Sequence, residues 1–417
     1  MSRVMKDSGI EWIGKIPEDW KISKYKFFSE TRMGETILKE NLLEDGIPVY
    51  SATEEEKIFG YVQNSVIELS VGDLVIPARG NSIGYAKIIK DDVATCTQTT
   101  ICSKLKNIIS KYVYYCTIGF KDYWFDSEQT AIPQITVEQV KNNMLVVPSI
   151  KKQTKIANFL DEKCEILDKQ ITNNQKSIEL LEEYKESIIS ELITSGIYAN
   201  VKFKEVQSKY FKYIPQNWSF TSLKYLSNKI TDGTHQTPNY IHEGYPFISI
   251  KDISSGKIDL TNCKYISSEE YKTLSKHTKI EKGDILFCRI GTLGKPVIVD
   301  IDENFSIFVS LGLIKPKHDK INNRFLKYVM GSSYYKDYIN LEKVGEGTHA
   351  AKFNLNSVAK SPIILPSLEE QKEIADYLDD KCSKIDRVIE YRKQIIEKLE
   401  EYKKSLIYEA VTGKIEV

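Results

Sequence analysis

Residues 147–197 read VPSIKKQTKIANFLDEKCEILDKQITNNQKSIELLEEYKESIISELITSGI. A closely similar stretch, residues 365–415, follows 218 residues later as LPSLEEQKEIADYLDDKCSKIDRVIEYRKQIIEKLEEYKKSLIYEAVTGKI. About 22 of the 51 aligned positions are identical without a gap. This period is far longer than the roughly 20–50 residues of a solenoid repeat. We therefore expect a duplicated unit, made of a globular domain and a long helix, and a fold with pseudo-twofold symmetry.

Both copies carry residues at alternating steps of four and three that predict a coiled-coil seam. About 34 residues at 1.5 Å each give a helix of roughly 50 Å. Neither helix would keep an apolar stripe in water alone, so we expect the two to pack on each other, antiparallel. The apolar seam positions are Leu160, Leu167, Ile171, Ile178, Leu181 and Ile188 in the first copy, and Leu378, Ile385, Ile389, Ile396, Leu399 and Leu406 in the second.

Signals at the helix ends agree with this interpretation. Ser367 followed by Glu370 forms the pattern of a capping box at the start of the second helix. Gly196 and Gly413 stand where each helix should end, because glycine favours the left-handed conformation of a C-cap.

The seam also contains polar and sulfur-bearing positions. The polar ones either fix the register of the pair or extend their charged ends to solvent. Cys164 and Cys382 occupy matched positions and are expected to be small core residues, not a disulfide or metal site. The polar seam positions are Asn174, Lys185, Arg392 and Lys403.

The duplication extends more faintly beyond the helices. IGKIPEDW (13–20) matches KYIPQNW (212–218), and VGDLVIPARGNSIG (71–84) matches EKGDILFCRIGTLG (281–294). Arg79 and Arg289 each stand five residues before a glycine, which suggests equivalent positions. Between these landmarks the halves share little, so two similar helices should carry two divergent domains. The predicted boundaries are 1–147 and 201–364 for the globular domains, and 148–200 and 365–417 for the helical segments.

Composition limits the class of protein. The chain lacks a run of 18 apolar residues, and its N-terminal residues lack the apolar centre of a signal peptide. Its 7 cysteines form no CxxC pair and are expected to be reduced thiols. We therefore expect a cytoplasmic protein.

Charge is distributed unevenly, although the 58 basic and 58 acidic side chains cancel over the whole chain. Residues 201–364 carry about 24 basic and 16 acidic side chains, a net charge near +8, whereas the other segments are mildly acidic. A basic domain is a plausible footprint for a polyanion. The alternative is a basic surface without a partner, and the first domain gains no such support.

Together these features resemble the specificity subunit of type I restriction–modification systems. The shared order is an IPxxW opening, a GDxxxxxR…G strand, and PSxxxQxxIAxxLD leading a long helix that ends in TGKI. In addition, ITDGTHQTPNY (230–240) and ATCTQTTI (94–101) are similar to target-recognition sequences of that family.

The resemblance implies two α/β target recognition domains separated by two helices that also dock two methyltransferase subunits. Double-stranded DNA and restriction/translocase subunits would be further partners, in a bacterial or archaeal cell and without a membrane. S-adenosylmethionine, ATP and Mg would be bound by the partner subunits, and this chain would hold no cofactor.

Catalytic motifs are missing from the residues. We find no dinucleotide-binding GxGxxG, no GxxxxGK[ST] and no Asn/Asp-Pro-Pro-aromatic tetrad of an adenine methyltransferase. GEGTHAAK (345–352) lacks the Gly-Lys-Thr/Ser finish of a phosphate loop. The five histidines, of which His349 lies in this segment, show no metal-ligand spacing. The chain is therefore expected to have no catalytic or metal site.

In the first domain, the candidate DNA contacts are an arginine before small residues and a threonine-rich turn. Arginine reads guanine or grips phosphate, and glutamine pairs bidentately with adenine. A strand-end turn with a surface arginine, and an exposed edge strand, are the structural alternatives. The candidates are Arg79, Gly80, Asn81 and Ser82, then Thr97, Gln98 and Thr99, and Gln134, which the family resemblance suggests.

In the second domain, a polar turn precedes the corresponding arginine loop. Its side chains suit groove contacts, although a turn closed by its own aspartate would look the same. Lys352 is added because its place before the helix matches that of Gln134. The candidates are Asp232, Gly233, Thr234, His235 and Thr237, then Arg289, Gly291, Thr292 and Lys295, and Lys352.

The expected function is DNA-sequence recognition without catalysis, with each domain reading one half of a bipartite, asymmetric site. The helix pair would set the distance between the two halves. Two other classes stay open at this point: an enzyme whose nuclease or methyltransferase activity is hidden in the globular domains, and an adaptor that joins proteins without reading DNA.

Overall fold

The computed structural model describes residues 3–53, 57–125, 133–198, 200–208, 210–345 and 351–417. The chain divides into two compact units, Met1–Lys176 with Arg392–Val417, and Ser177–Tyr391. We call these unit 1 and unit 2. Each unit contains one globular domain of mixed strands and helices and a part of both long helices, which confirms the expected α/β class.

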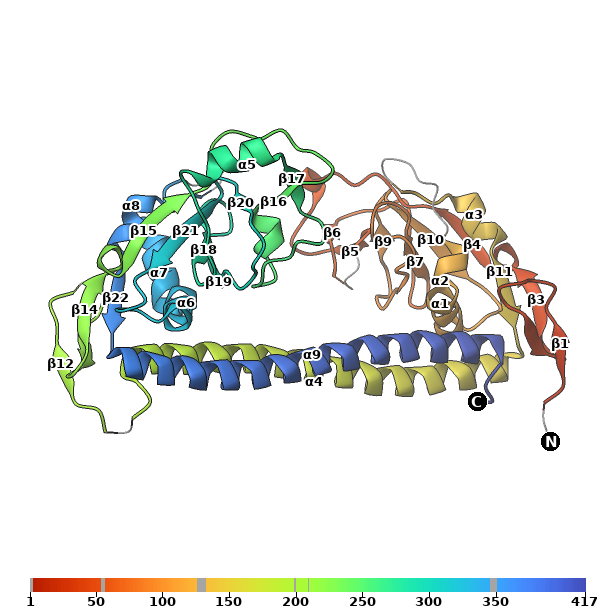
Figure 1. The fold of residues 1–417 in the computed structure, drawn as a ribbon. Helices are drawn as coiled ribbons and strands as arrows, with labels where there is room; N and C mark the ends of the chain where they lie inside the picture. Colours follow the sequence, from red (N-terminus) through yellow and green to blue (C-terminus); the bar gives the residue numbers. More distant parts are fainter. Residues whose placement is uncertain (1–2, 54–56, 126–132, 199, 209, 346–350) are drawn as a thin grey trace. The chain divides into compact units, whose positions relative to one another are not determined.

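The two repeated segments form the longest helices of the described chain (Figure 1), α4 (Ile150–Ser195) and α9 (Leu368–Thr412). They contain 46 and 45 residues, more than the 34 expected, because the PSxxxQxxIA segment before the seam is already helical. Gly196 and Gly413 follow their last residues with φ of 83° and 73°, which confirms the predicted ends.

Unit 1 contains two antiparallel pairs, β1 with β2 and β3 with β11, a four-stranded antiparallel sheet of order β4-β10-β7-β8, and a three-stranded sheet of order β6-β5-β9. The strands are β1 (Met5–Asp7), β2 (Lys15–Pro17), β3 (Lys21–Lys24), β4 (Ser29–Met33), β5 (Ile47–Tyr50), β6 (Gly60–Val62), β7 (Leu74–Pro77), β8 (Lys87–Ile88), β9 (Thr95–Cys96), β10 (Thr100–Leu105) and β11 (Met144–Val147). The short helices are η1 (Tyr25–Phe27), η2 (Lys39–Asn41), α1 (Ser110–Gly119), α2 (Lys121–Trp124) and α3 (Val137–Asn142).

Unit 2 repeats this topology with β12-β13, β14-β22, β15-β21-β18-β19 and β17-β16-β20. Its strands are β12 (Phe203–Glu205), β13 (Tyr213–Pro215), β14 (Ser219–Ser222), β15 (Ser227–Asp232), β16 (Tyr245–Ile248), β17 (Lys264–Ile266), β18 (Ile285–Cys288), β19 (Gly294–Ile298), β20 (Ser306–Ile307), β21 (Leu311–Pro316) and β22 (Pro362–Leu365). Its short helices are η3 (Leu223–Tyr225), η4 (Ile250–Ile253), α5 (Ser268–Ser275), α6 (Asn323–Gly331), α7 (Ser333–Glu342) and α8 (Leu355–Lys360). Every sheet of unit 1 thus has a counterpart in unit 2.

The predicted seam is present in both units. All twelve apolar seam residues are buried or half-buried. In unit 1, Leu160 and Leu167 of α4 share a core with Leu406 of α9. In unit 2, Leu378 belongs to the core that also contains Ile193. Cys164 and Cys382 are each buried in the core of their own unit, as expected for small core residues.

The polar seam residues bond across the helices and do not simply extend into solvent. In unit 1, the Lys403 ammonium lies 2.6 Å from the Asp168 carboxylate. In unit 2, Lys185 lies 2.6 Å from Asp386. These are equivalent pairs, because 168 and 185 each differ from 386 and 403 by the same 218 positions. They favour the view that the polar positions fix the register.

Asn174 and Arg392, the remaining polar seam pair, are also equivalent positions of the two copies. Within unit 1 they meet each other: Arg392 Nη1 donates to Asn174 Oδ1 at 2.9 Å. The direction of α9 is therefore opposite to that of α4, since 392 lies opposite 174 while 403 lies opposite 168. The expected antiparallel pairing is confirmed within the unit.

A glutamine near the start of each long helix fastens the globular domain to it. Gln153 Oε1 accepts a hydrogen bond from the Ile109 amide at 2.9 Å, and its Nε2 donates to the Pro148 carbonyl at 2.8 Å. Gln371 accepts from the Asn322 amide at 2.8 Å and donates to the Pro366 carbonyl at 3.1 Å. The glutamine of PSxxxQxxIA is therefore a structural residue in both copies.

An aspartate two turns further along makes a second attachment. In unit 1, Tyr115 of α1 donates to Asp161 at 2.8 Å, and Lys111 pairs with the same carboxylate. In unit 2, Tyr328 of α6 donates to Asp379 at 2.7 Å. Burial first, and then the bond to the aspartate, raises the pKa of both tyrosines. Each hydroxyl thus remains a donor at physiological pH.

The helix ends contact the IPxxW segments. A Cβ on Gly413 would lie 2.6 Å from Pro17 and 2.9 Å from Trp20, and a Cβ on Gly196 would lie 3.1 Å from Trp218. The predicted cap at Ser367 is present, since its hydroxyl accepts from the Glu370 amide at 3.2 Å.

The reciprocal half of the predicted capping box is wrong. The Glu370 carboxylate accepts instead from the Trp218 indole at 2.9 Å, because the indole lies within its reach.

Candidate DNA-recognition surfaces

In unit 1 the predicted residues collect at one end of the four-stranded sheet. Arg79 follows β7 and forms an isolated antiparallel bridge with Gln134. The Ala78 amide donates to the Thr99 carbonyl at 3.0 Å, which places the threonine-rich turn beside the same loop. The side chains of Arg79 and Gln134 are exposed. The backbone therefore gathers three segments that are distant in sequence into one surface.

The side chains of this surface differ in their exposure and in their hydrogen bonds. Gln98 is exposed and accepts from Thr36 at 2.7 Å, whereas the Thr97 and Thr99 hydroxyls bond to each other at 2.8 Å. Asn81 is exposed, but Ser82 is buried and donates to the Ala52 carbonyl at 2.9 Å. Gly80, which precedes these two residues, has a φ of 76° and allows the chain to turn there.

In unit 2, Arg289 has a different environment from Arg79. Its guanidinium forms an ion pair with the Asp232 carboxylate, and only 11% of the arginine side chain and 14% of the aspartate side chain are exposed. His235, which is 71% exposed, lies 3.1 Å from the same carboxylate. Arg289 is thus occupied within the protein, and it holds the Asp232–His235 turn in place.

The suggested equivalence of Arg79 and Arg289 is wrong. The Arg289 amide bonds to the Ser310 carbonyl at 2.9 Å, as Ala78 bonds to Thr99 in unit 1. Ile290 bridges to Lys352, as Arg79 bridges to Gln134. The two arginines align only if the halves are matched at Gly84 and Gly294. The loop GNSIG is one residue longer than GTLG, so that match shifts the preceding strands by one residue.

The proposed equivalence of Gln134 and Lys352 is confirmed by those two bridges. The flanking bonds also match: Gly80 donates to the Pro133 carbonyl at 3.0 Å, and Gly291 to the Ala351 carbonyl at 2.9 Å. Lys352 is exposed, as are Thr237, Thr292 and Lys295.

One feature of the first domain lies outside the predicted site residues. Gly34 follows β4 as Gly233 follows β15, and a Cβ on either glycine would come within 2.2 Å or 2.1 Å of a neighbouring carbonyl oxygen. Only glycine allows this close approach. The available signal was the pair MGET and DGTH, whose glycines occupy the same place after a strand. Thr36, two residues after Gly34, is the residue that contacts Gln98.

A cavity of about 240 Å³ opens beside the turn of unit 2. Its lining includes Thr234 and His277, and the buried Ser306 hydroxyl, which has no hydrogen-bond partner among the described residues. The described part of the chain contains no group of three histidine, cysteine or acidic residues placed to hold a metal ion. Within those same residues, no helix combines the length and apolarity needed to cross a membrane. His349 lies outside them.

Comparison with known proteins defines the class. Residues 17–183 and 215–401 match the type I restriction modification DNA specificity domain, once in each half. The specificity subunit of the MjaVIII type I restriction enzyme of Methanocaldococcus jannaschii is 25% identical, over 97% of this chain and 94% of its own. The putative MjaX specificity subunit of that organism is 27% identical over 97% and 96%.

A chain in a solved structure of a type I restriction–modification system has the same fold, with a TM-score of 0.73, 14% identity, and coverage of 96% of this chain and 99% of that one. The chain belongs to the type I restriction–modification DNA specificity family. It is a DNA-recognition subunit, not a catalytic one.

Proposed function

We propose that this chain recognises a bipartite, asymmetric DNA site, with residues 1–147 reading one half and residues 201–364 the other. The helical segments 148–200 and 365–417 would set the distance between the half-sites. The observation that carries this proposal is the pair of equivalent backbone clusters whose side chains differ. Arg79 and Gln134 stand where Ile290 and Lys352 stand in unit 2.

Exposed side chains of each cluster would make the contacts. In the first domain these are Arg79, Asn81, Gln98 and Gln134, whose groups suit guanine, adenine and phosphate. In the second they are His235, Thr237, Thr292, Lys295 and Lys352. Arg289 would act through Asp232, by orienting the turn that carries His235.

Partners would supply the chemistry. We propose that two methyltransferase subunits dock on the helices, one per repeated copy, and that restriction/translocase subunits join them in the cytoplasm. S-adenosylmethionine, ATP and Mg would then be bound by those subunits. The segments LEEYKES and LEEYKKS, residues 181–187 and 399–405, are nearly identical, and five of the seven side chains in each are exposed, which suits two copies of one partner.

The test is to assay the purified chain alone and with its cognate methyltransferase subunit. The chain alone should transfer no methyl group and bind DNA weakly. The complex should contain two methyltransferase copies per chain and methylate adenines at one asymmetric sequence. Methyl transfer by the chain alone would favour a hidden enzyme. A complex that shows no sequence preference on DNA would favour a simple adaptor.

A further inference from the structure

A second surface corresponds position by position in the two units, although the sequence comparison found little similarity there. The Lys106 amide donates to the Phe28 carbonyl at 2.9 Å, and the Lys317 amide donates to the Leu226 carbonyl at 2.8 Å. These bonds align the ends of β10 and β21 with the short helices η1 and η3.

Three lysines and one aromatic residue are shared on this basis. We call the lysines the lysine rim: Lys26, Lys104 and Lys106 in unit 1, and Lys224, Lys315 and Lys317 in unit 2. The aromatic neighbour is Phe27 in unit 1, 63% exposed, and Tyr225 in unit 2, 58% exposed. The Lys26 ammonium lies 5.7 Å from the Phe27 ring, and the Lys224 ammonium 4.7 Å from the Tyr225 ring.

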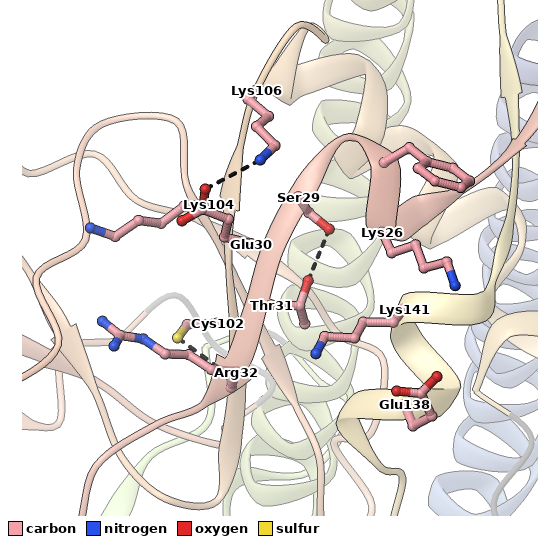
Figure 2. Close-up of a pocket in the computed structure, with 11 residues that line it drawn as sticks. Lys26, Ser29, Glu30, Thr31, Arg32, Cys102, Lys104, Lys106, Glu138 and Lys141 are labelled. Atoms are coloured by element: carbon pink, nitrogen blue, oxygen red, sulfur yellow. Dashed lines mark hydrogen bonds and ion pairs between the residues drawn. The ribbon is translucent and has the colours of Figure 1, made fainter.

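In unit 1 the rim borders a hollow of about 730 Å³ formed by η1, β4, β10 and α3 (Figure 2). Arg32 and Lys141 add two further cations to its lining, whereas Glu30 and Glu138 are its two acids. Glu30 is paired with Lys106 at 3.2 Å. Five basic side chains thus face two acidic ones on a domain whose overall charge is negative.

In unit 2 the lysines of the rim have different neighbours. Lys315 is paired with Asp284 at 2.8 Å and with Glu281 at 2.9 Å, so it offers little charge to a ligand. Lys229 lies opposite Lys315 in the sheet register, where unit 1 has Glu30 opposite Lys104. An acid at that position is therefore replaced by a base.

The recognition clusters and the lysine rim differ in which features the two units share. At the clusters the backbone is shared and the side chains differ, whereas at the rim the lysines themselves are shared. A ligand met in the same form by both domains explains this difference. In a bipartite DNA site the bases differ between the halves, but the phosphates do not.

We propose that the lysine rims bind the phosphate backbone of DNA, one rim in each half-site, without regard to base sequence. This inference rests on the proposed function, because it assigns the sequence-independent part of the same DNA contact. Ammonium groups beside an exposed ring suit a chain of phosphates and sugars. A protein partner is disfavoured because a cationic hollow requires a matching acidic surface, whereas DNA is anionic throughout.

The test compares two variants with four substitutions each in the full-length chain. The rim variant carries K26Q, K106Q, K224Q and K317Q, which leaves the paired Lys315 intact. The control carries K6Q, K15Q, K202Q and K204Q, which removes the same charge from exposed lysines of β1, β2 and the β12 region. Both are titrated with a labelled duplex of random sequence over a range of salt concentrations. Melting temperatures verify that both fold.

Phosphate contact predicts weaker binding by the rim variant than by the control. It also predicts a logarithmic salt dependence that is less steep by roughly 0.9 for each lysine that meets a phosphate. The sequence methylated by the complex with the methyltransferase should stay the same. Equal slopes and affinities for rim variant and control would overturn the proposal.

Two further results would also overturn it. A changed methylated sequence would show that the rim reads bases. Loss of methyltransferase binding with unchanged duplex binding would show a protein-docking surface. The proposed function is judged separately: it fails if the wild-type complex methylates no defined sequence, whereas the rim is decided by the random duplex.

Discussion

The two halves of the chain share different features at two places: where the domains attach to the long helices, and at the recognition clusters. At the helices the side chains are kept: Gln153 corresponds to Gln371, and Asp161 to Asp379, and each makes the same type of bond. At the clusters only the backbone bonds are kept. The duplicated chain thus separates a constant attachment from a variable reading surface, and each can be perturbed alone.

Arg79 and Arg289 give the largest expected difference between the two kinds of position. Replacing Arg289 with alanine leaves the mostly buried Asp232 carboxylate without its arginine partner, which should cost roughly 3 kcal/mol of unfolding free energy. Replacing the exposed Arg79 should change stability by less than about 0.5 kcal/mol. It should instead weaken recognition of one half-site by roughly 1–3 kcal/mol. Denaturant unfolding and DNA titration measure the two effects.

The matched control for this pair is the double variant Arg289→Ala with Asp232→Ala, which removes both charges. It should recover part of the lost stability, because no buried carboxylate is left unpaired. Equal stability losses for Arg79→Ala and Arg289→Ala would mean that the ion pair does not organise unit 2.

Alanine substitutions at Gly413 and Gly9 distinguish the stability cost of a packing collision from that of backbone strain. Both have φ of 73°, but a Cβ on Gly9 meets nothing within 4 Å, whereas one on Gly413 would collide with Pro17 and Trp20. Gly9→Ala should cost about 1–2 kcal/mol from strain alone. Gly413→Ala should cost roughly 1–3 kcal/mol more, because the IPxxW segment must move. Thermal unfolding compares them, and equal costs would contradict the close contact.

The Asn174–Arg392 pair gives the smallest of the stability effects. Because these equivalent positions face each other, Asn174→Arg places two arginines together and should destabilise the chain by about 1 kcal/mol. Arg392→Asn should be tolerated within about 0.5 kcal/mol, and it also removes the buried Arg392 Nε that lacks a partner among the described residues. Similar losses for both variants would show that the pairing is not self-facing.

The sequence predicted the scaffold well because period and capping chemistry are local properties. The four-three spacing from Leu160 to Leu406 identified buried and half-buried residues, and Gly196 and Gly413 marked the helix ends. Helix length was underestimated, since the segment before the seam is already helical and its Ile156 and Phe159 pack into the core of unit 1.

The site was predicted less well because it depends on register between distant strands. A loop one residue longer in the first domain was enough to equate Arg79 with Arg289, which the hydrogen bonds place at different positions. The burial of Arg289 depends on Asp232, 57 residues away in sequence, and no local pattern reports such a pair. The sequence did not predict the lysine rim for the same reason, because its lysines come from separate elements.

The central claim is that constant attachments carry interchangeable readers. It is tested most directly by replacing residues 201–364 with a second copy of residues 1–147, in a chain that keeps both long helices. Asp379, Gln371 and Gly196 can receive the first domain as Asp161, Gln153 and Gly413 do.

With the methyltransferase subunit, the folded chimera should methylate a palindrome in which both halves are the first half of the wild-type site. The measurement is sequencing of methylated DNA. A folded chimera that methylates no palindrome, or that keeps the asymmetric wild-type sequence, would contradict the account.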